Sequence, residues 1–272
     1  MAKMLDKLSL DGRSIVVTGG GTGLGRAMVR ALARAGADLV IAGRRQAPID
    51  EAAAEVEGLG RRAVAVSTDV SDSAQVERMV AVARDVLGRV DVLVNNAGRT
   101  AENVHAPIWD ITDEEWRAGI ATNLTGAFYC ARAVARQMVD QGRGKIINVA
   151  SGYGLRGGRD MYAYTCSKGG VIQLTRTLAM SLGRYGVTAN TIVPGFIPTR
   201  GTDSMRDALP RSGEFIPTGK LGTPEDMGPI AVFLASDASD YMNGETITLD
   251  GGGLAGGLAP TGHAPIIPLD LG

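Results

Sequence analysis

The sequence predicts an α/β domain built on a doubly wound parallel sheet. Short apolar runs rich in β-branched residues recur along the chain, and most lack apolar–polar alternation, as strands buried on both faces do. Between these runs lie segments with apolar residues at helical spacing and with helix start and stop signals. Repeated strand–helix alternation with right-handed crossovers gives a parallel sheet with helices on both faces.

The expected strands share this nearly continuous apolar character. They span residues 14–17, 38–41, 63–66, 90–94, 145–149, 188–193 and 246–249. The first expected helix spans 23–35 and stops before Gly36. A capping box that begins at Thr112 starts a longer helix that runs to about residue 138. Pro224 marks the first position of another helix.

Length and composition favour a single large domain. The chain has 272 residues, of which 44% are hydrophobic, enough for a substantial core without disulfides or metals. No change in composition marks a linker before Gly251, so residues 1–253 are expected to form one domain. Residues 254–272 are rich in Gly, Ala and Pro, and their apolar end favours an arm packed on a neighbouring subunit over a mobile tail.

Charge and cysteine content exclude several classes of function. The formal net charge of -1 gives no general attraction to nucleic acid or anionic membranes. No segment has the apolar length of a membrane span or a signal peptide, so we expect a cytoplasmic protein. Cys130 and Cys166 lack metal-ligand spacing and His105 and His263 form no motif, so no metal site is expected.

A glycine-rich loop follows the first expected strand and begins the first expected helix. It runs from Thr18 to Gly25 with the sequence TGGGTGLG. Glycines here allow a tight turn and a close approach of the backbone to a pyrophosphate at the positive end of the helix. The loop therefore predicts nucleotide binding. The expected contacts are Gly19, Thr22, Gly23, Leu24 and Gly25.

A phenol and an ammonium group lie one helical turn apart later in the chain. Tyr164 and Lys168 are four positions apart, and Ser151 lies thirteen positions before the tyrosine. A free phenol has a pKa near ~10, and a nearby positive charge favours the phenolate and lowers that pKa. The pair is a candidate general acid/base. Tyr153 and Tyr162 have no lysine at the same offset.

Taken together, these motifs resemble those of the short-chain dehydrogenase/reductase family. The chain also carries Asn95-Asn96-Ala97-Gly98 after the fourth expected strand, Asn123 in the next helix, and Pro194-Gly195 after the sixth strand. The motifs match the family in order and spacing over roughly residues 10–253. The resemblance implies a Rossmann-type domain with a seven-stranded parallel sheet of order 3-2-1-4-5-6-7. It also implies a homotetramer assembled through the helices that carry Asn123 and the tyrosine.

The resemblance further implies an active site of Asn123, Ser151, Tyr164 and Lys168. Ser151 is expected to hydrogen-bond the substrate oxygen, and Tyr164 to transfer the proton as hydride moves between nicotinamide C4 and the substrate carbon. Lys168 is expected to lower the phenol pKa and to hold the nicotinamide ribose. Asn123 is expected to interrupt its helix and to support a water that relays protons to Lys168. Ser167 is expected to be an ordinary helix-face residue.

The end of the second expected strand bears on the choice of cofactor. Arg44 and Arg45 stand there without a carboxylate, which suits the 2′-phosphate of NADP better than the free 2′-hydroxyl of NAD. By resemblance, Asp69 and Val70 contact the adenine, and Thr199 helps to hold the nicotinamide or the phosphates. The other cofactor contacts expected by resemblance are Asn96, Ala97, Gly98, Tyr164, Lys168, Pro194, Gly195 and Ile197.

Substrate choice is expected to lie in the loops beyond the strand ends. These are residues 99–109, 152–161 and 200–221, and a lid is expected over about 199–221. The charged and aromatic candidates for the pocket also fit solvated loop positions. They are Arg99, His105, Tyr153, Arg156 and Arg200.

Three functions are compatible with the sequence. The chain is most similar in general to bacterial 3-oxoacyl-carrier-protein reductases and to polyol, gluconate and cyclic-ketone reductases. We favour a small-molecule ketone or secondary-alcohol oxidoreductase. A carrier-protein reductase would need a basic patch, for which Arg132, Arg136 and Arg184 are available. A catalytically silent nucleotide sensor or scaffold would be expected to have lost part of the serine–tyrosine–lysine set.

Overall fold

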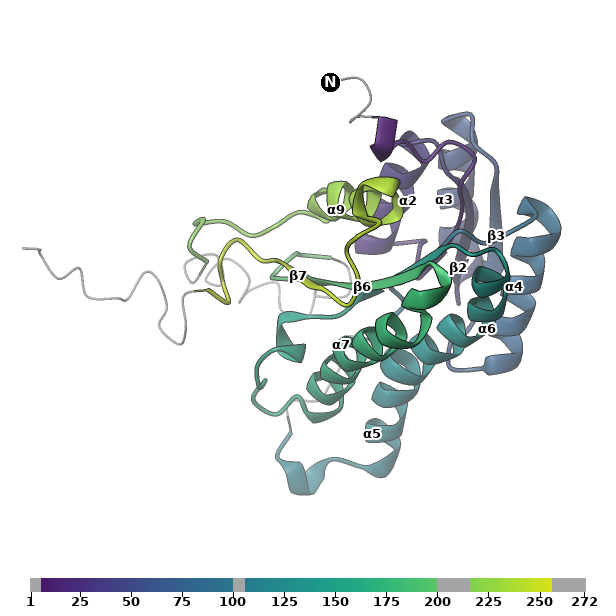
Figure 1. Ribbon diagram of the computed structural model, residues 1–272. Helices are drawn as coiled ribbons and strands as arrows, with labels where there is room; N and C mark the ends of the chain where they lie inside the picture. Colours follow the sequence, from purple (N-terminus) through teal and green to yellow (C-terminus); the bar gives the residue numbers. More distant parts are fainter. Residues whose placement is uncertain (1–5, 100–105, 200–215, 256–272) are drawn as a thin grey trace, which may run out of the picture.

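The computed structural model describes residues 6–99, 106–199 and 216–255. Its centre is a seven-stranded sheet with the order β3-β2-β1-β4-β5-β6-β7, in which every neighbouring pair is parallel (Figure 1). The predicted fold class and strand order are confirmed.

The seven predicted strands are all present, and their bounds differ from the prediction by no more than two residues. Alternate residues of the central strands supply two separate cores, because Ile15 and Val17 of β1 face one side while Val16 faces the other. The strands are β1 Ser14–Thr18, β2 Asp38–Gly43, β3 Ala63–Ser67, β4 Val92–Asn95, β5 Gly144–Val149, β6 Val187–Pro194 and β7 Thr246–Leu249.

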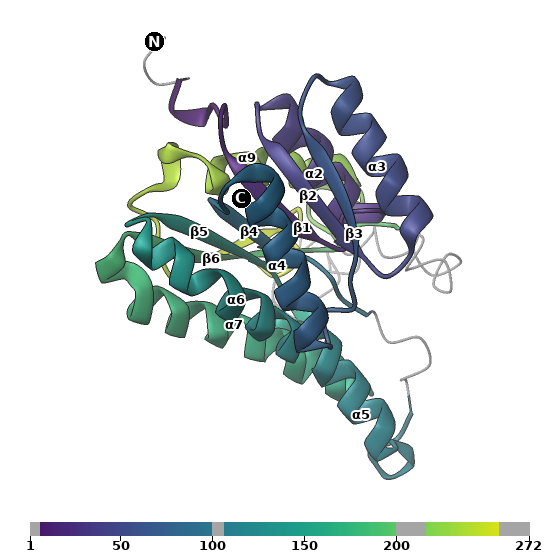
Figure 2. The same cartoon turned by 90° about the vertical axis from the view of Figure 1, so that its right-hand side faces the viewer.

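Helices cover both faces of the sheet (Figures 1 and 2). One core is closed by α2 (Gly23–Arg34), α3 (Gln46–Gly58) and α9 (Met227–Ala235). The other face is covered by α4 (Ser73–Leu87), α6 (Gly126–Asp140) and α7 (Tyr162–Leu182). Short 3-10 turns complete the described elements: Asp6–Leu8, Ile108–Asp110, Gly152–Gly154, Gly183–Tyr185, Pro224–Asp226 and Asp237–Ser239.

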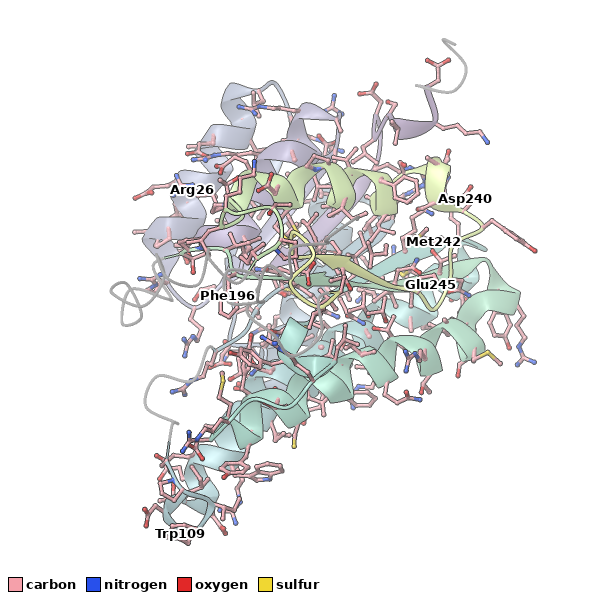
Figure 3. All side chains as sticks on the ribbon, turned by 90° about the vertical axis from the view of Figure 1, so that its left-hand side faces the viewer. Arg26, Trp109, Phe196, Asp240, Met242 and Glu245 are labelled. Carbon is pink, nitrogen blue, oxygen red and sulfur yellow. The ribbon has the colours of Figure 1, made fainter. Side chains whose placement is uncertain are left out.

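The helix expected from Thr112 to about residue 138 is divided. It consists of α5 (Asp113–Ile120), a π-helical turn (Ala121–Thr125) and α6. The predicted capping box is present, with the Thr112 hydroxyl and the Glu115 carboxylate each accepting the other's backbone N–H. Figure 3 places Trp109 at the outer tip of the projection that α5 forms beyond the sheet.

The sheet positions a site at the carboxyl ends of its central strands. From β1 the chain continues to β2, its neighbour on one side of the sheet, whereas the neighbour of β1 on the other side is β4. The strand order therefore reverses between β1 and β4, and in sheets of this kind a crevice lies at that point. The glycine loop follows β1, Asn96 follows β4, Ser151 follows β5 and Gly195 follows β6.

Some predictions fall on residues outside the described ranges. They include His105, Arg200, most of the lid expected over 199–221 and nearly all of the arm expected over 254–272. Within the described ranges, no helix combines the length and apolarity needed to cross a bilayer.

Candidate active site

The glycine loop is shaped by contacts that exclude side chains. A Cβ atom at Gly25 would lie 2.1 Å from the carbonyl oxygen of Gly19, and one at Gly19 would lie 2.9 Å from the Cα atom of Ala97. Gly19 and Gly23 also have positive φ angles of 65° and 53°. Thr22 is the N-cap residue of α2, and its side chain makes no capping hydrogen bond. The N-terminus of α2 therefore presents backbone N–H groups behind a glycine surface, which fits a pyrophosphate.

The motif after β4 holds this loop in place. The Nδ2 atom of Asn96 donates to the carbonyls of Thr18 (3.0 Å) and Gly19 (3.1 Å). In return, Thr18 Oγ1 accepts from the backbone N–H groups of Asn96 and Ala97, each at 3.1 Å. These bonds fix the end of β1 against the end of β4, so the predicted cofactor residues of the two motifs lie side by side.

The predicted adenosine contacts gather at the ends of β2 and β3. Burial opposes ionisation of Asp69, but hydrogen bonds from Ser71 outweigh it, with a further contribution from the Arg44 charge, and the pKa of Asp69 is lowered. Arg44 and Arg45 are exposed. The side chain of Val70 is buried against Gly126.

The remaining predicted cofactor contacts are Thr199 and the segment after β6. A Cβ atom at Gly23 would lie 3.3 Å from Thr199 Cγ2, so Thr199 lies over the start of α2. The Gly195 N–H donates to the carbonyl of Leu249 at 2.9 Å, which ties this segment to β7, and Ile197 is buried.

Asn123 lies in the π-helical turn, as its predicted interruption of the helix requires. Its Oδ1 atom accepts from the backbone N–H of Arg99 at 2.8 Å, and its Nδ2 atom donates to the Arg99 carbonyl at 3.2 Å. The side chain thus pairs with the chain that continues from β4. Gly98 leaves room beside it, because a Cβ atom there would lie 3.2 Å from Asn123 Oδ1 and 3.5 Å from Lys168 Nζ.

Ser151 and Tyr164 are brought together from separate elements. Ser151 follows β5, and its Oγ atom accepts from the backbone N–H of Tyr153 at 3.3 Å. Tyr164 lies in the first turn of α7. Burial raises the pKa of Tyr164, a hydrogen bond from Ser151 lowers it in part, and Tyr153 adds to the rise. The prediction of a phenol pKa lowered by Lys168 is therefore wrong for the chain by itself, because desolvation dominates.

Lys168 is buried, and its Nζ atom donates to the carbonyl of Val149 at 2.9 Å. The same atom lies 5.9 Å from the centre of the Tyr164 ring. Burial lowers the pKa of Lys168 to about 8. The amine is therefore directed to the end of β5, next to Ser151, rather than to solvent.

Ser167 was expected to be an ordinary helix-face residue, and the structure corrects this. Its side chain is fully buried; its Oγ atom donates to the Tyr164 carbonyl at 2.7 Å and accepts from Asn123 Nδ2 at 3.2 Å. Ser167 therefore joins the π-helical turn to the first turn of α7. The sequence does carry a signal for this role of Ser167, because the positions three and four residues after Tyr164 lie on the same helix face as Tyr164.

Comparisons with known proteins agree with this geometry. The family model described as enoyl-(acyl carrier protein) reductase matches residues 19–253. The chain belongs to the short-chain dehydrogenase/reductase family. It is 38% identical over 258 residues to 2-dehydro-3-deoxy-D-gluconate 5-dehydrogenase of Dickeya dadantii, covering 93% of this chain and 99% of that one.

Other members of this dehydrogenase/reductase family are similar over the same length. A 3-oxoacyl-[acyl-carrier-protein] reductase of Synechocystis is 37% identical, with 90% of this chain and 98% of the relative covered. The crystal structure of a gluconate 5-dehydrogenase from Burkholderia cenocepacia in complex with NADP and tartrate matches with a TM-score of 0.87 and 35% identity, covering 92% and 98%. The chain is thus an NAD(P)-dependent oxidoreductase of the short-chain dehydrogenase/reductase family.

Proposed function

We propose that the protein transfers hydride between the nicotinamide C4 of NADP and the carbon of a small-molecule ketone or secondary alcohol. The observation that carries the proposal is the proximity of Ser151, Tyr164 and Lys168 at the end of β5, next to the Asn96–Gly98 motif that holds the glycine loop. When bound, the nicotinamide supplies or accepts the hydride.

Each of the proposed catalytic side chains has a separate role. Ser151 holds the substrate oxygen near the phenol, and Tyr164 gives a proton to that oxygen in reduction or takes it in oxidation. Lys168, held by the Val149 carbonyl, places a positive charge beside the ring and binds the nicotinamide ribose. Asn123 keeps the backbone at Arg99 in place and supports the water that returns protons to Lys168.

NADP is the proposed cofactor because Arg44 and Arg45 stand exposed at the end of β2. Support also comes from the Burkholderia relative, which was crystallised with NADP. If the guanidinium groups bind a 2′-phosphate, Arg44→Ser lowers kcat/KM for NADPH about tenfold or more and leaves the value for NADH nearly unchanged. Arg136→Ser, which removes an exposed arginine from α6, is the control. Equal losses for both cofactors would contradict the assignment.

Relatives suggest that the substrate belongs to the polyols and sugar acids. Two of the proteins described above are named as dehydrogenases of gluconate or of a deoxygluconate derivative. Such compounds carry the secondary alcohols that the proposed reaction needs.

A carrier-protein reductase is the second candidate, supported by the Synechocystis relative. The arginines available for an acidic partner are engaged with their own neighbours. The Arg132 guanidinium lies over the rings of Phe128 and Tyr129, at 5.4 and 5.0 Å from their centres. Arg136 pairs with Asp140 at 3.0 Å. These contacts favour the small-molecule substrate.

A homotetramer is proposed for the assembly. Trp116 on α5, Phe128 on α6 and Met180 on α7 are exposed apolar residues of the helices that carry or flank the site. Light scattering on the full chain and on a chain ending at Gly253 tests both the assembly and the predicted arm. An unchanged mass after truncation would contradict the arm.

The decisive test is a spectrophotometric screen. NADPH oxidation is followed with a panel of ketones, and NADP reduction with alditols and aldonates. The proposal expects turnover of at least one carbonyl–alcohol pair. Tight NADPH binding without turnover of any member would favour the nucleotide sensor instead.

A further inference from the structure

An arginine of the loop after β5 is stacked on an aromatic ring beside the phenol. The Arg156 Cζ atom lies 5.5 Å from the centre of the Tyr153 ring. Tyr153 in turn meets Tyr164 edge to face, with ring centres 6.4 Å apart and planes inclined by 72°. The Tyr153 ring therefore has both the guanidinium group and the proposed proton donor as neighbours.

The loop holds this stack in a defined place. The backbone N–H groups of Leu155 and Arg156 donate to the carbonyl of Gly152, directly after Ser151, at 3.0 and 3.2 Å. Gly158 packs closely against the Tyr153 ring, since a Cβ atom at this glycine would lie 2.9 Å from Tyr153 Cδ1. The position of Arg156 is thus set by the same turn that sets Ser151.

The two arginines of the loop differ in their partners. Arg159 pairs with Asp160 at 3.5 Å, and Asp160 also accepts from the Tyr162 hydroxyl at 3.4 Å. Within the described ranges, Arg156 forms no ion pair; the Tyr153 ring is its neighbour. Arg156 is exposed, so its guanidinium N–H groups are available to a planar anion such as a carboxylate.

We infer that Arg156 binds a carboxylate of the substrate, so that the substrate is a hydroxy or keto acid. This inference rests on the proposed function and names the substrate class of the same site. Since the guanidinium lies over the Tyr153 ring, whose centre is 6.4 Å from that of Tyr164, we expect the carboxylate to stand several carbon atoms from the reacting carbon. An acid oxidised at its far end fits this arrangement, whereas a 2-keto acid does not.

Binding of matched acids and alditols tests the inference without turnover. D-gluconate and D-galactonate are compared with sorbitol and galactitol, which replace the carboxylate by a hydroxymethyl group. Affinities are measured by calorimetry at pH 7 with saturating NADPH, a combination in which an alcohol cannot be oxidised. The proteins are the full-length wild type, Arg156→Gln, Arg156→Lys and Arg159→Gln as the matched control.

We expect the wild type to bind at least one acid more tightly than the matching alditol. Acid binding should weaken as the salt concentration is raised. Arg156→Gln should weaken acid binding about tenfold or more while alditol binding stays within about twofold, and Arg156→Lys should recover part of the loss. Arg159→Gln should leave acid binding as in the wild type.

Two results would overturn the inference: no preference for any acid in the wild type, or equal acid binding in the wild type and Arg156→Gln. The outcome is separable from that of the proposed function. NADPH binding and alcohol turnover without an Arg156-dependent preference would overturn the carboxylate alone. Arg156-dependent acid binding without turnover of any alcohol would support the carboxylate and overturn the proposed reaction.

Discussion

The amine of Lys168 lies 5.9 Å from the centre of the Tyr164 ring and is bound to the carbonyl of Val149. Burial raises the pKa of Tyr164 and lowers that of Lys168 to about 8. Burial is the largest cause of both shifts, since a low-dielectric surrounding disfavours each group's charged form. In the chain by itself, desolvation therefore decides the direction of both shifts.

The buried amine predicts a specific dependence of stability on pH. The folded-state pKa of Lys168 is lowered to about 8, whereas an unfolded lysine titrates near ~10.4. Between these two pKa values the unfolded chain holds a proton that the folded chain lacks. The free energy of unfolding of the wild type therefore increases with pH over this range. Lys168→Met lacks the titrating amine, so its free energy of unfolding does not show this increase. The difference in unfolding free energy, variant minus wild type, should fall by about 1–3 kcal/mol between pH 7 and 9.5.

Urea unfolding at pH 7, 8.5 and 9.5 measures this difference. Lys220→Met, which removes an exposed lysine, controls for the loss of a surface charge. A difference that stays constant over the range would contradict the lowered pKa.

Asn123→Ala should reduce both activity and stability. It removes the two hydrogen bonds to the Arg99 backbone and leaves polar groups without partners, at a cost of about 1–3 kcal/mol in unfolding free energy. We expect kcat to fall about tenfold or more. Ser167→Ala keeps the Arg99 bonds but removes the link to the Tyr164 carbonyl, and should have a smaller effect on stability.

Thermal unfolding and steady-state kinetics on both variants check this order. If Ser167→Ala loses as much stability as Asn123→Ala, the bonds to the Arg99 backbone are not the main contribution of Asn123.

Gly25→Ala should weaken dinucleotide binding. The new Cβ atom would lie 2.1 Å from the Gly19 carbonyl oxygen, so the loop must move away from its pyrophosphate-binding shape. Fluorescence titration with NADPH should show affinity lower by about 1.4 kcal/mol or more, which is tenfold. Gly58→Ala is the matched control, because a Cβ atom there meets nothing within 4 Å. Wild-type affinity in Gly25→Ala would contradict the assignment of the loop.

The fold could be predicted from the sequence because its signals are local. Strands buried on both faces read as apolar runs, so the prediction for β2 was short by only two residues, Ala42 and Gly43. β7, which is only partly buried, was predicted with its observed bounds. The capping box at Thr112 fixed the start of α5 in the same way. Asn123 was expected to interrupt its helix, and the interruption is a π-helical turn.

The rest depends on contacts between distant parts of the chain. The pKa of Tyr164 has the opposite direction from the prediction because its largest cause is burial, which no spacing reveals. Ser167 was missed because its partner Asn123 lies forty-four positions earlier. The stacking of Arg156 on Tyr153 could not be distinguished from a solvated loop by sequence alone.

The most direct measurement is the rate of NADPH oxidation by Tyr164→Phe on the best ketone from the screen, with NADPH affinity measured in parallel. Removing the hydroxyl should lower kcat about a hundredfold or more while NADPH affinity stays within about threefold of the wild type. Tyr162→Phe, two positions away on the same helix and without a lysine at the matching offset, should retain nearly full activity. A Tyr164→Phe enzyme that keeps wild-type kcat would contradict the assignment of proton transfer to this residue.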